Sequence, residues 1–171
     1  MKKSYSFLHT IFFLISSIFL LENNSVNAAE KVVFNYKIFN QSLPVEELKK
    51  LTDTGEVSPT LNYYLKKTNQ DPQTVRDVLT EELNVSTTTL DSTLNSKIGE
   101  FLLDQISQTI HTPSNRENRK ALRSAIIISS SEDNKVSLIE IIQNYPTKEV
   151  HVKTDNLART YSQLSILIEG P

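Results

Sequence analysis

The sequence predicts a mainly α-helical domain, built as a compact bundle of about eight short helices with a small two-stranded sheet. Apolar residues recur at three- and four-residue spacing along most of the chain, and helix-capping side chains stand directly before these stretches. Only Lys31–Phe39 and Glu149–Lys153 alternate apolar and polar residues as half-buried strands do. Glycine occurs three times, so tight polar turns are expected between the helices.

The two expected strands lie near the two ends of the domain. The apolar positions that alternate in the first strand are Val32, Phe34, Tyr36 and Ile38. In the second strand Val150 and Val152 flank His151, which places His151 on the opposite, exposed face. Pairing of the N-terminal strand with this strand near residue 150 would form the two-stranded sheet.

The first four expected helices have recognisable starts. One covers Pro44–Thr54, and two begin with a capping residue followed by proline, at Ser58-Pro59 and Asp71-Pro72, because proline has no N–H that needs a partner there. Ser86 is expected to cap the fourth helix. The residues expected to face the core are Val45, Leu48, Leu51, Leu61, Tyr64, Leu65, Val75, Val78, Leu79, Leu83, Leu90 and Leu94.

The other four expected helices complete the bundle. A longer amphipathic helix is expected from Ile98 to Ile110, with Phe101 widening its buried stripe. Capping boxes at Ser114–Glu117 and Ser137–Glu140 each predict a helix start, and a last helix follows Asp155. The residues expected to be buried in the helices after residue 114 include Leu122, Ala125, Ile126, Ser129, Leu157, Tyr161, Leu164 and Ile168.

Residues 1–28 have the pattern of a secretory signal peptide. Two lysines precede an apolar run from Phe7 to Leu21, and small residues lead to an expected cleavage after Ala28. The run is shorter than the ~20 apolar residues that a membrane-spanning helix needs, so no membrane span is expected after cleavage. We therefore expect a single helical domain at residues 29–171, exported to the periplasm or the extracellular medium.

Composition argues against several classes of function. The 18 Lys and Arg residues against 20 Asp and Glu residues give a net charge of −2, so no nucleic-acid partner is expected. The absence of cysteine excludes a thiol nucleophile and a thiolate metal site. No glycine-rich phosphate loop is present, and we expect no cofactor.

The stretch His111 to Ala125 gathers the residues with most chemical capability. A nucleophilic Ser114 would need a base such as His111 or His151 and, in the α/β-hydrolase class, glycines beside it at a strand-to-helix turn. Ser114 has no flanking glycine, and its spacing to Glu117 predicts a helix cap instead. We therefore expect no catalytic residue, while Ser114, His111 and His151 stay the candidates that an enzyme would use.

A metal site is not expected either. The loop Ser129–Glu140 has the length of a calcium-binding helix-loop-helix, but serine replaces the first aspartate and Asn134 replaces the sixth-position glycine. The capping box explains Glu140 better than a calcium ligand does. His111 and His151 would need carboxylates from distant segments to complete a metal site.

Four segments, taken in order, resemble one protein family. They are KVVFNY, PVEELKKLTDTGEVSPTLNYYL, IGEFLLDQISQTIHTPSNRENRKALRSAI and VSLIEIIQNYPTKEVHV. They resemble the domain of unknown function of exported proteins from photosynthetic bacteria, which precedes α/β-hydrolase domains and is named after them. The resemblance spans residue 29 to about Leu167 and implies a helical module that accompanies a hydrolase domain. It supplies no catalytic residue, and the sequence has no Gly-x-Ser-x-Gly motif.

These observations lead to one expectation and two alternatives. We expect an exported, non-catalytic helical module that serves as a lid, docking or accessory domain for an α/β-hydrolase acting in trans. A weak ester hydrolase, with Ser114 or another serine activated by His111 or His151, is the first alternative. A small-ligand binder of the cell envelope, using a groove among the helices, is the second.

Overall fold

The computed structural model describes residues 28–36 and 39–153, together with Gln163 and Ile166. The described part is mainly helical, as predicted, and contains seven helices and six strands. Residues 1–27 of the expected signal peptide lie outside it, and so does most of the expected last helix. No helix in the described part has the length and apolar character that crossing a membrane requires.

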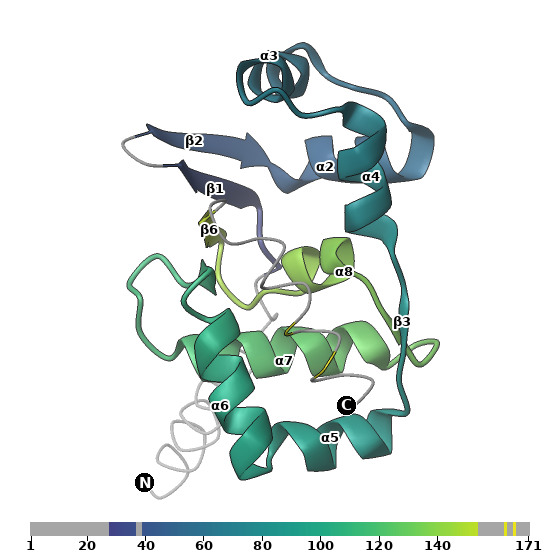
Figure 1. The fold of residues 1–171 in the computed structure, drawn as a ribbon, viewed down its shortest axis with the longest axis vertical. Helices are drawn as coiled ribbons and strands as arrows, with labels where there is room; N and C mark the ends of the chain where they lie inside the picture. The colour runs from purple at the N-terminus through teal and green to yellow at the C-terminus, as the bar shows by residue number, and fades with distance from the viewer. Residues whose placement is uncertain (1–27, 37–38, 154–162, 164–165, 167–171) are drawn as a thin grey trace, which may run out of the picture.

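The main sheet has four strands in the order β2-β1-β6-β4 (Figure 1). β1 (Lys31–Tyr36) pairs in parallel with β6 (Glu149–Lys153), which confirms the pairing of the two expected strands. The prediction of only two strands is wrong, because β2 (Phe39–Pro44) pairs with β1 and β4 (Ile110–His111) pairs with β6. Leu43 alone among the described side chains of β2 is buried, and β4 has two residues, so neither strand shows a clear alternation.

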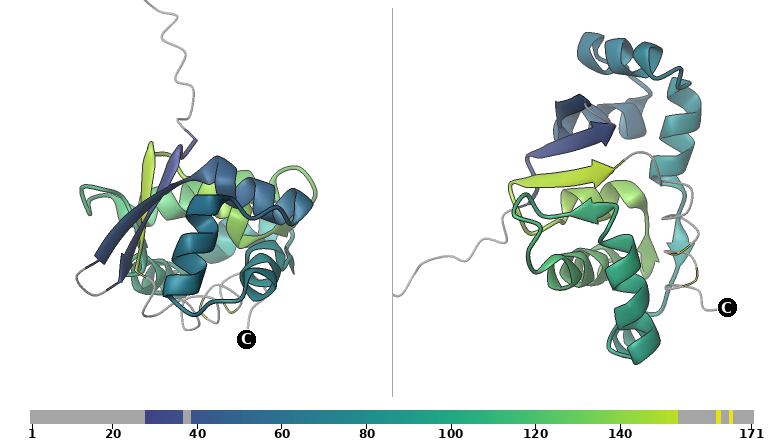
Figure 2. Two further views of the ribbon diagram at one scale, coloured as in Figure 1. Left: turned by 90° about the horizontal axis from the view of Figure 1, so that it is seen from above. Right: turned by 60° about the vertical axis from the view of Figure 1, so that its left-hand side comes forward.

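The two faces of the sheet differ in character. Register and alternation place one set of apolar side chains on the same face, where they join the buried core: Val32, Phe34, Leu43, Ile110, Val150 and Val152. Helices cover this face (Figure 2). His111, Val33 and His151 belong to the opposite face, so the sheet separates the two histidines from the main core.

Four helices follow the hairpin of β1 and β2: α2 (Val45–Thr54), α3 (Pro59–Lys67), α4 (Pro72–Thr80) and α5 (Thr87–Leu94). The predicted caps of α3 and α4 are confirmed, since Ser58 accepts a hydrogen bond from the Leu61 N–H and Asp71 accepts one from the Thr74 N–H. Ser86 stands at the cap position of α5 without a side-chain capping bond. Most residues predicted to face the core here are buried or partly buried, but Val78 is exposed.

The remaining helices are α6 (Lys97–Ile106), α7 (Asn118–Ser130) and α8 (Leu138–Gln143). α7 lies at the centre and contacts α5, α6, α8 and β4 (Figure 1). Its predicted buried residues Leu122, Ala125 and Ile126 are fully buried. The capping box at Ser137–Glu140 is confirmed, and β5 (Lys135–Val136) before it pairs with β3 (Leu83–Asn84).

The prediction for α6 is wrong in its end and in two residues of its buried face, Ile98 and Phe101. The helix stops at Ile106 instead of continuing to Ile110, and its buried residues are Gly99, Leu103 and Ile106. A Cβ atom on Gly99 would lie 1.9 Å from the Thr93 carbonyl oxygen, so the glycine face is the one that can approach the end of α5. The side chains of Ile98 and Phe101 therefore point away, and these residues are 73% and 61% exposed.

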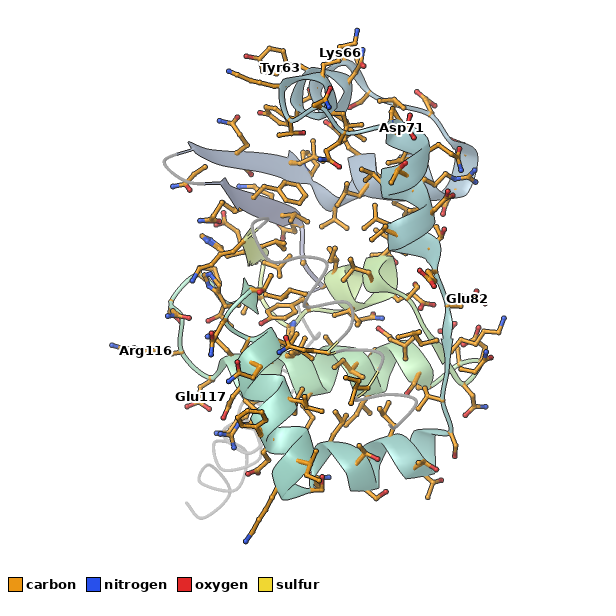
Figure 3. All side chains as sticks on the ribbon, viewed as in Figure 1. Tyr63, Lys66, Asp71, Glu82, Arg116 and Glu117 are labelled. Atoms are coloured by element: carbon orange, nitrogen blue, oxygen red, sulfur yellow. The ribbon has the colours of Figure 1, made fainter. Side chains whose placement is uncertain are left out.

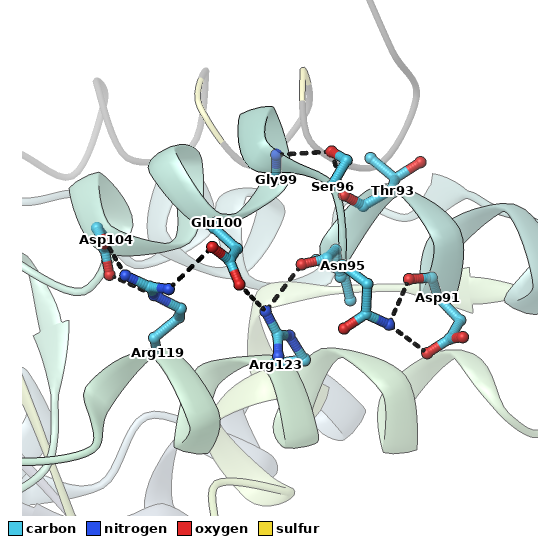
Figure 4. A network of polar contacts seen from close by, with 10 residues as sticks. Asp91, Thr93, Asn95, Ser96, Gly99, Glu100, Asp104, Arg119 and Arg123 are labelled. Atoms are coloured by element: carbon cyan, nitrogen blue, oxygen red, sulfur yellow. Dashed lines mark hydrogen bonds and ion pairs between the residues drawn. The ribbon is translucent and has the colours of Figure 1, made fainter.

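Ion pairs join α6 to α7, and a hydrogen bond joins α7 to the end of α5 (Figure 4). Arg119 pairs with Asp104 and Glu100, while Arg123 donates to the Leu94 carbonyl and lies 3.8 Å from the Glu100 carboxylate. The side chain of Arg123 is only 23% exposed. These contacts fix the orientation of α6, and with it the direction in which Ile98 and Phe101 project.

Candidate functional site

His111 and His151 lie next to each other on β4 and β6, where they are directly registered partners of the antiparallel pair. Their ring centroids are 5.4 Å apart, and the ring planes are inclined at 36°. His111 is 8% exposed, whereas the side chain of His151 is 21% exposed. The structure thus brings together two candidates that are forty residues apart in the chain.

The hydrogen bonding of His111 identifies the nitrogen that carries its proton. Its Nδ1 lies 2.9 Å from the carbonyl oxygen of Thr112, and a carbonyl can only accept, so Nδ1 donates. In the neutral ring Nε2 is then an acceptor with a free lone pair. Among the described residues, Nε2 has no hydrogen-bond partner even though it is buried. A buried unpaired acceptor of this kind calls for an explanation.

His151 lies beside an acidic side chain. Its Nε2 is 3.9 Å from the Glu149 carboxylate, which also pairs with Lys31 at 3.4 Å. Burial and the neighbouring His111 ring lower the pKa of His151, and Glu149 only partly offsets this shift. The imidazole of His151 is therefore neutral at pH 7, with a lone pair of its own.

The loop between β4 and α7 is organised by Thr112 and Asn118, and the predicted capping box at Ser114–Glu117 is wrong. The Asn118 side-chain oxygen accepts from the Thr112 N–H at 3.1 Å and from its hydroxyl at 2.9 Å. Asn115 and Glu117 have a φ of 54° each, in the left-handed region, so the chain turns sharply and α7 begins only at Asn118. Sequence spacing alone could not reveal these two left-handed residues.

Ser114 lies on the exposed surface of this loop. Its hydroxyl is 3.3 Å from the Thr112 hydroxyl, and no hydrogen bond joins it to His111 or His151 in the described structure. Nearby is an open hollow of about 560 Å³. The hollow is lined by Thr112, Pro113, Ser114, Arg116, Glu117, Lys120, Ala121, Pro146 and Thr147. Arg116 and Glu117 lie on the outer edge of the loop (Figure 3).

The structure describes the loop Ser129–Glu140 completely and gives it a structural role. Ser129 and Ser130 end α7 with side-chain bonds to backbone carbonyls, and the Glu140 carboxylate accepts from the Ser137 N–H. Within the described ranges, no group of three or more His, Asp or Glu side chains is placed to hold a metal ion.

Sequence reasoning missed the proximity of the two histidines. The expected helix ran to Ile110 and hid the short strand that carries His111. A signal was present, because Thr109, Ile110 and Thr112 are β-branched and Pro113 disfavours a helical conformation at the residue before it. These residues indicate an extended segment, but they do not identify its partner.

Comparison with known proteins gives one match. The model of the family described as alpha/beta hydrolase of unknown function (DUF1400) matches residues 28–153. This range includes β4, β6 and all seven described helices. No curated protein and no solved structure matches the chain.

Proposed function

From the premise that the chain belongs to the family described as alpha/beta hydrolase of unknown function, we propose that it is a non-catalytic module that docks onto an α/β-hydrolase domain. The observation that carries this proposal is the exposed apolar pair Ile98 and Phe101 on α6, in a chain without the serine arrangement of that enzyme class. The hydrolase domain supplies the catalysis, and this module binds it and covers part of its surface.

The residues of this chain argue against catalysis of its own. In the α/β-hydrolase class the nucleophilic serine stands in a Gly-x-Ser-x-Gly turn, and neither this motif nor a glycine next to Ser114 occurs in the sequence. The hydroxyl of Ser114 lies beside Thr112, and Nδ1 of His111 is engaged by a carbonyl. Neither contact would raise the nucleophilicity of the serine.

The sheet also differs from the one that carries the catalytic turn in that class. Doubly wound α/β domains have a mostly parallel sheet with helices on both faces. Here the parallel pair of the four-stranded sheet is β1 with β6, while β1–β2 and β4–β6 are antiparallel. The described structure is therefore consistent with a domain that accompanies the hydrolase fold.

α6 provides the surface that we assign to docking. Ile98 and Phe101 are three residues apart and so lie on one side of the helix. Large apolar side chains that gather on an exposed surface are typical of sites that bind another protein. Aromatic residues are also enriched in such interfaces. The Arg119 and Arg123 contacts hold this helix in place before the partner binds, which limits the entropy lost on docking.

Export is part of the proposal, because the pattern of residues 1–28 supports a signal peptide. The family match begins at residue 28, one residue before the expected start of the mature chain. Docking would then occur in the periplasm or outside the cell.

An ester-hydrolysis assay tests the non-catalytic part of the proposal. Purified chain is incubated with p-nitrophenyl acetate and p-nitrophenyl butyrate, and release of p-nitrophenol is compared with that from the Ser114→Ala and His151→Gln variants. We expect similar low rates in all three samples, since the background from the lysine side chains is the same in each and the loss of one imidazole in His151→Gln removes only a small part of the total. A rate that falls sharply in both variants would instead support the weak-hydrolase alternative.

A further inference from the structure

We propose that His111 and His151 form a binding site for a divalent transition-metal ion, which would link β4 to β6. Two imidazoles, side by side across an antiparallel strand pair, supply the nitrogen ligands that Zn²⁺ and Cu²⁺ prefer. The site is independent of the docking surface on α6, and it uses residues that the proposed function leaves without a role.

His111 has the hydrogen bonding of a metal ligand. Ligating histidines almost always donate their second ring N–H to a carbonyl, carboxylate or water, which orients the ring and leaves the other nitrogen for the ion. The Nδ1 bond to the Thr112 carbonyl does this. It leaves the lone pair of the buried Nε2, which has no hydrogen-bond partner among the described residues, for a metal ion. Bonding to a metal ion would give this nitrogen a partner.

The separation of the two rings fits one shared ion. With metal–nitrogen bonds of about 2.0–2.1 Å and a tetrahedral angle, two imidazole centroids would lie roughly 5 Å apart. The observed distance between the centroids is 5.4 Å. The spacing of the two rings is therefore compatible with the binding of one ion by both.

The surroundings admit a cation. The partly exposed side of His151 gives an entry path from solvent, and the Glu149 carboxylate near its Nε2 contributes a negative charge. Lys31 pairs with Glu149 and opposes part of this attraction. Because the described residues offer no cluster of three ligands, water would complete the coordination shell. Binding should then be stronger for Cu²⁺ than for Zn²⁺, following the general order of divalent ions.

Calorimetric titration of the full chain with ZnCl₂, together with electron paramagnetic resonance of the Cu²⁺ form, tests this site. We expect one ion per chain and a Cu²⁺ spectrum with hyperfine structure from two imidazole nitrogens. His151→Gln should weaken Zn²⁺ binding by about tenfold or more and leave one nitrogen in the spectrum. This variant removes the more exposed histidine, and its circular dichroism spectrum should match that of the wild type.

An exposed carboxylate beside the second sheet provides the control. Glu82→Gln removes a possible ligand that pairs with Lys135 next to β3, and it should leave affinity and spectrum unchanged. Wild-type affinity in His151→Gln, or an equal loss in Glu82→Gln, would overturn the proposal. So would a wild-type chain that binds neither ion.

Discussion

The imidazole rings of His111 and His151 lie 5.4 Å apart, as registered partners on β4 and β6. This contact joins the loop that precedes the central helix α7 to the strand that also pairs with the N-terminal β1. The pair therefore lies where three distant segments of the chain meet. Any change in the charge of these rings acts on the connection between α7 and the sheet.

Stability should fall at mildly acidic pH when no metal ion is present. The pKa of His151 is lower in the folded protein than the usual value near 6.5, so the unfolded chain takes up a proton more readily. Its contribution to stability is complete above pH 6.5 and is lost as pH falls through the folded pKa. Burial, His111 and Glu149 are the causes acting on this group, in that order.

Urea unfolding in the presence of a chelator, at several pH values between 7.5 and 5, measures this effect. The free energy of unfolding should decrease toward pH 5 in the wild type and less steeply in His151→Gln. If the two proteins have the same pH dependence, His151 does not carry the effect.

Asn118→Ala should destabilise the start of α7. It removes the oxygen that accepts from the N–H and the hydroxyl of Thr112, a residue that is only 4% exposed. We expect a loss of about 1–2 kcal/mol in urea unfolding, as is typical when a buried donor loses its partner. Ser114→Ala is the control and should change stability by less than about 0.5 kcal/mol, as surface substitutions usually do. A larger loss of stability in Ser114→Ala than in Asn118→Ala would support the capping box at Ser114–Glu117.

Gly99→Ala should destabilise the protein, although the same change at an open position within a helix usually stabilises it by about 0.5–1 kcal/mol. The new Cβ atom would meet the Thr93 carbonyl oxygen at 1.9 Å and force α5 and α6 apart. A loss of about 1–3 kcal/mol is expected, as for other overpacked sites. Gly55→Ala is the comparison. No atom lies within 4 Å of a Cβ atom added at Gly55, so the only strain in that variant would come from the left-handed backbone. A more stable Gly99→Ala variant would show that the helices can separate without loss.

Much of the fold was predictable because local chemistry decides it. The caps at Ser58, Asp71 and Ser137 are short-range hydrogen bonds, and they mark helix starts wherever the surrounding sequence allows a helix. The strand at Glu149–Lys153 was predicted with its observed bounds, since its two valines alternate with polar residues. These signals depend only on residues that are close together in the sequence.

The failures have a common physical cause, which is that distant contacts decided the local structure. β4 is two residues long and exists because β6 lies beside it. The start of the buried face of α6 depends on the close approach of Gly99 to α5, so apolar spacing wrongly placed Ile98 and Phe101 on that face. The pairing of His111 with His151 depends on the pairing of β4 with β6, and neither histidine has a local sequence pattern that identifies the other.

The docking proposal predicts that α6 binds an α/β-hydrolase domain. Phe101→Ser removes an exposed aromatic side chain without disturbing the core, so it should weaken binding by about tenfold or more, as loss of a central aromatic anchor does. Tyr63→Ser is the matched control, because Tyr63 is 57% exposed on α3 at the opposite end of the molecule (Figures 1 and 3). Both variants should keep the wild-type helix content.

The most direct test is a titration of this chain, followed by calorimetry, into a purified α/β-hydrolase domain of the same family from the same organism. The account predicts a stoichiometric complex that Phe101→Ser weakens and Tyr63→Ser leaves intact. A hydrolase domain that binds wild type and Phe101→Ser equally well would contradict the role of α6. The absence of any complex with that domain would contradict the proposed function itself.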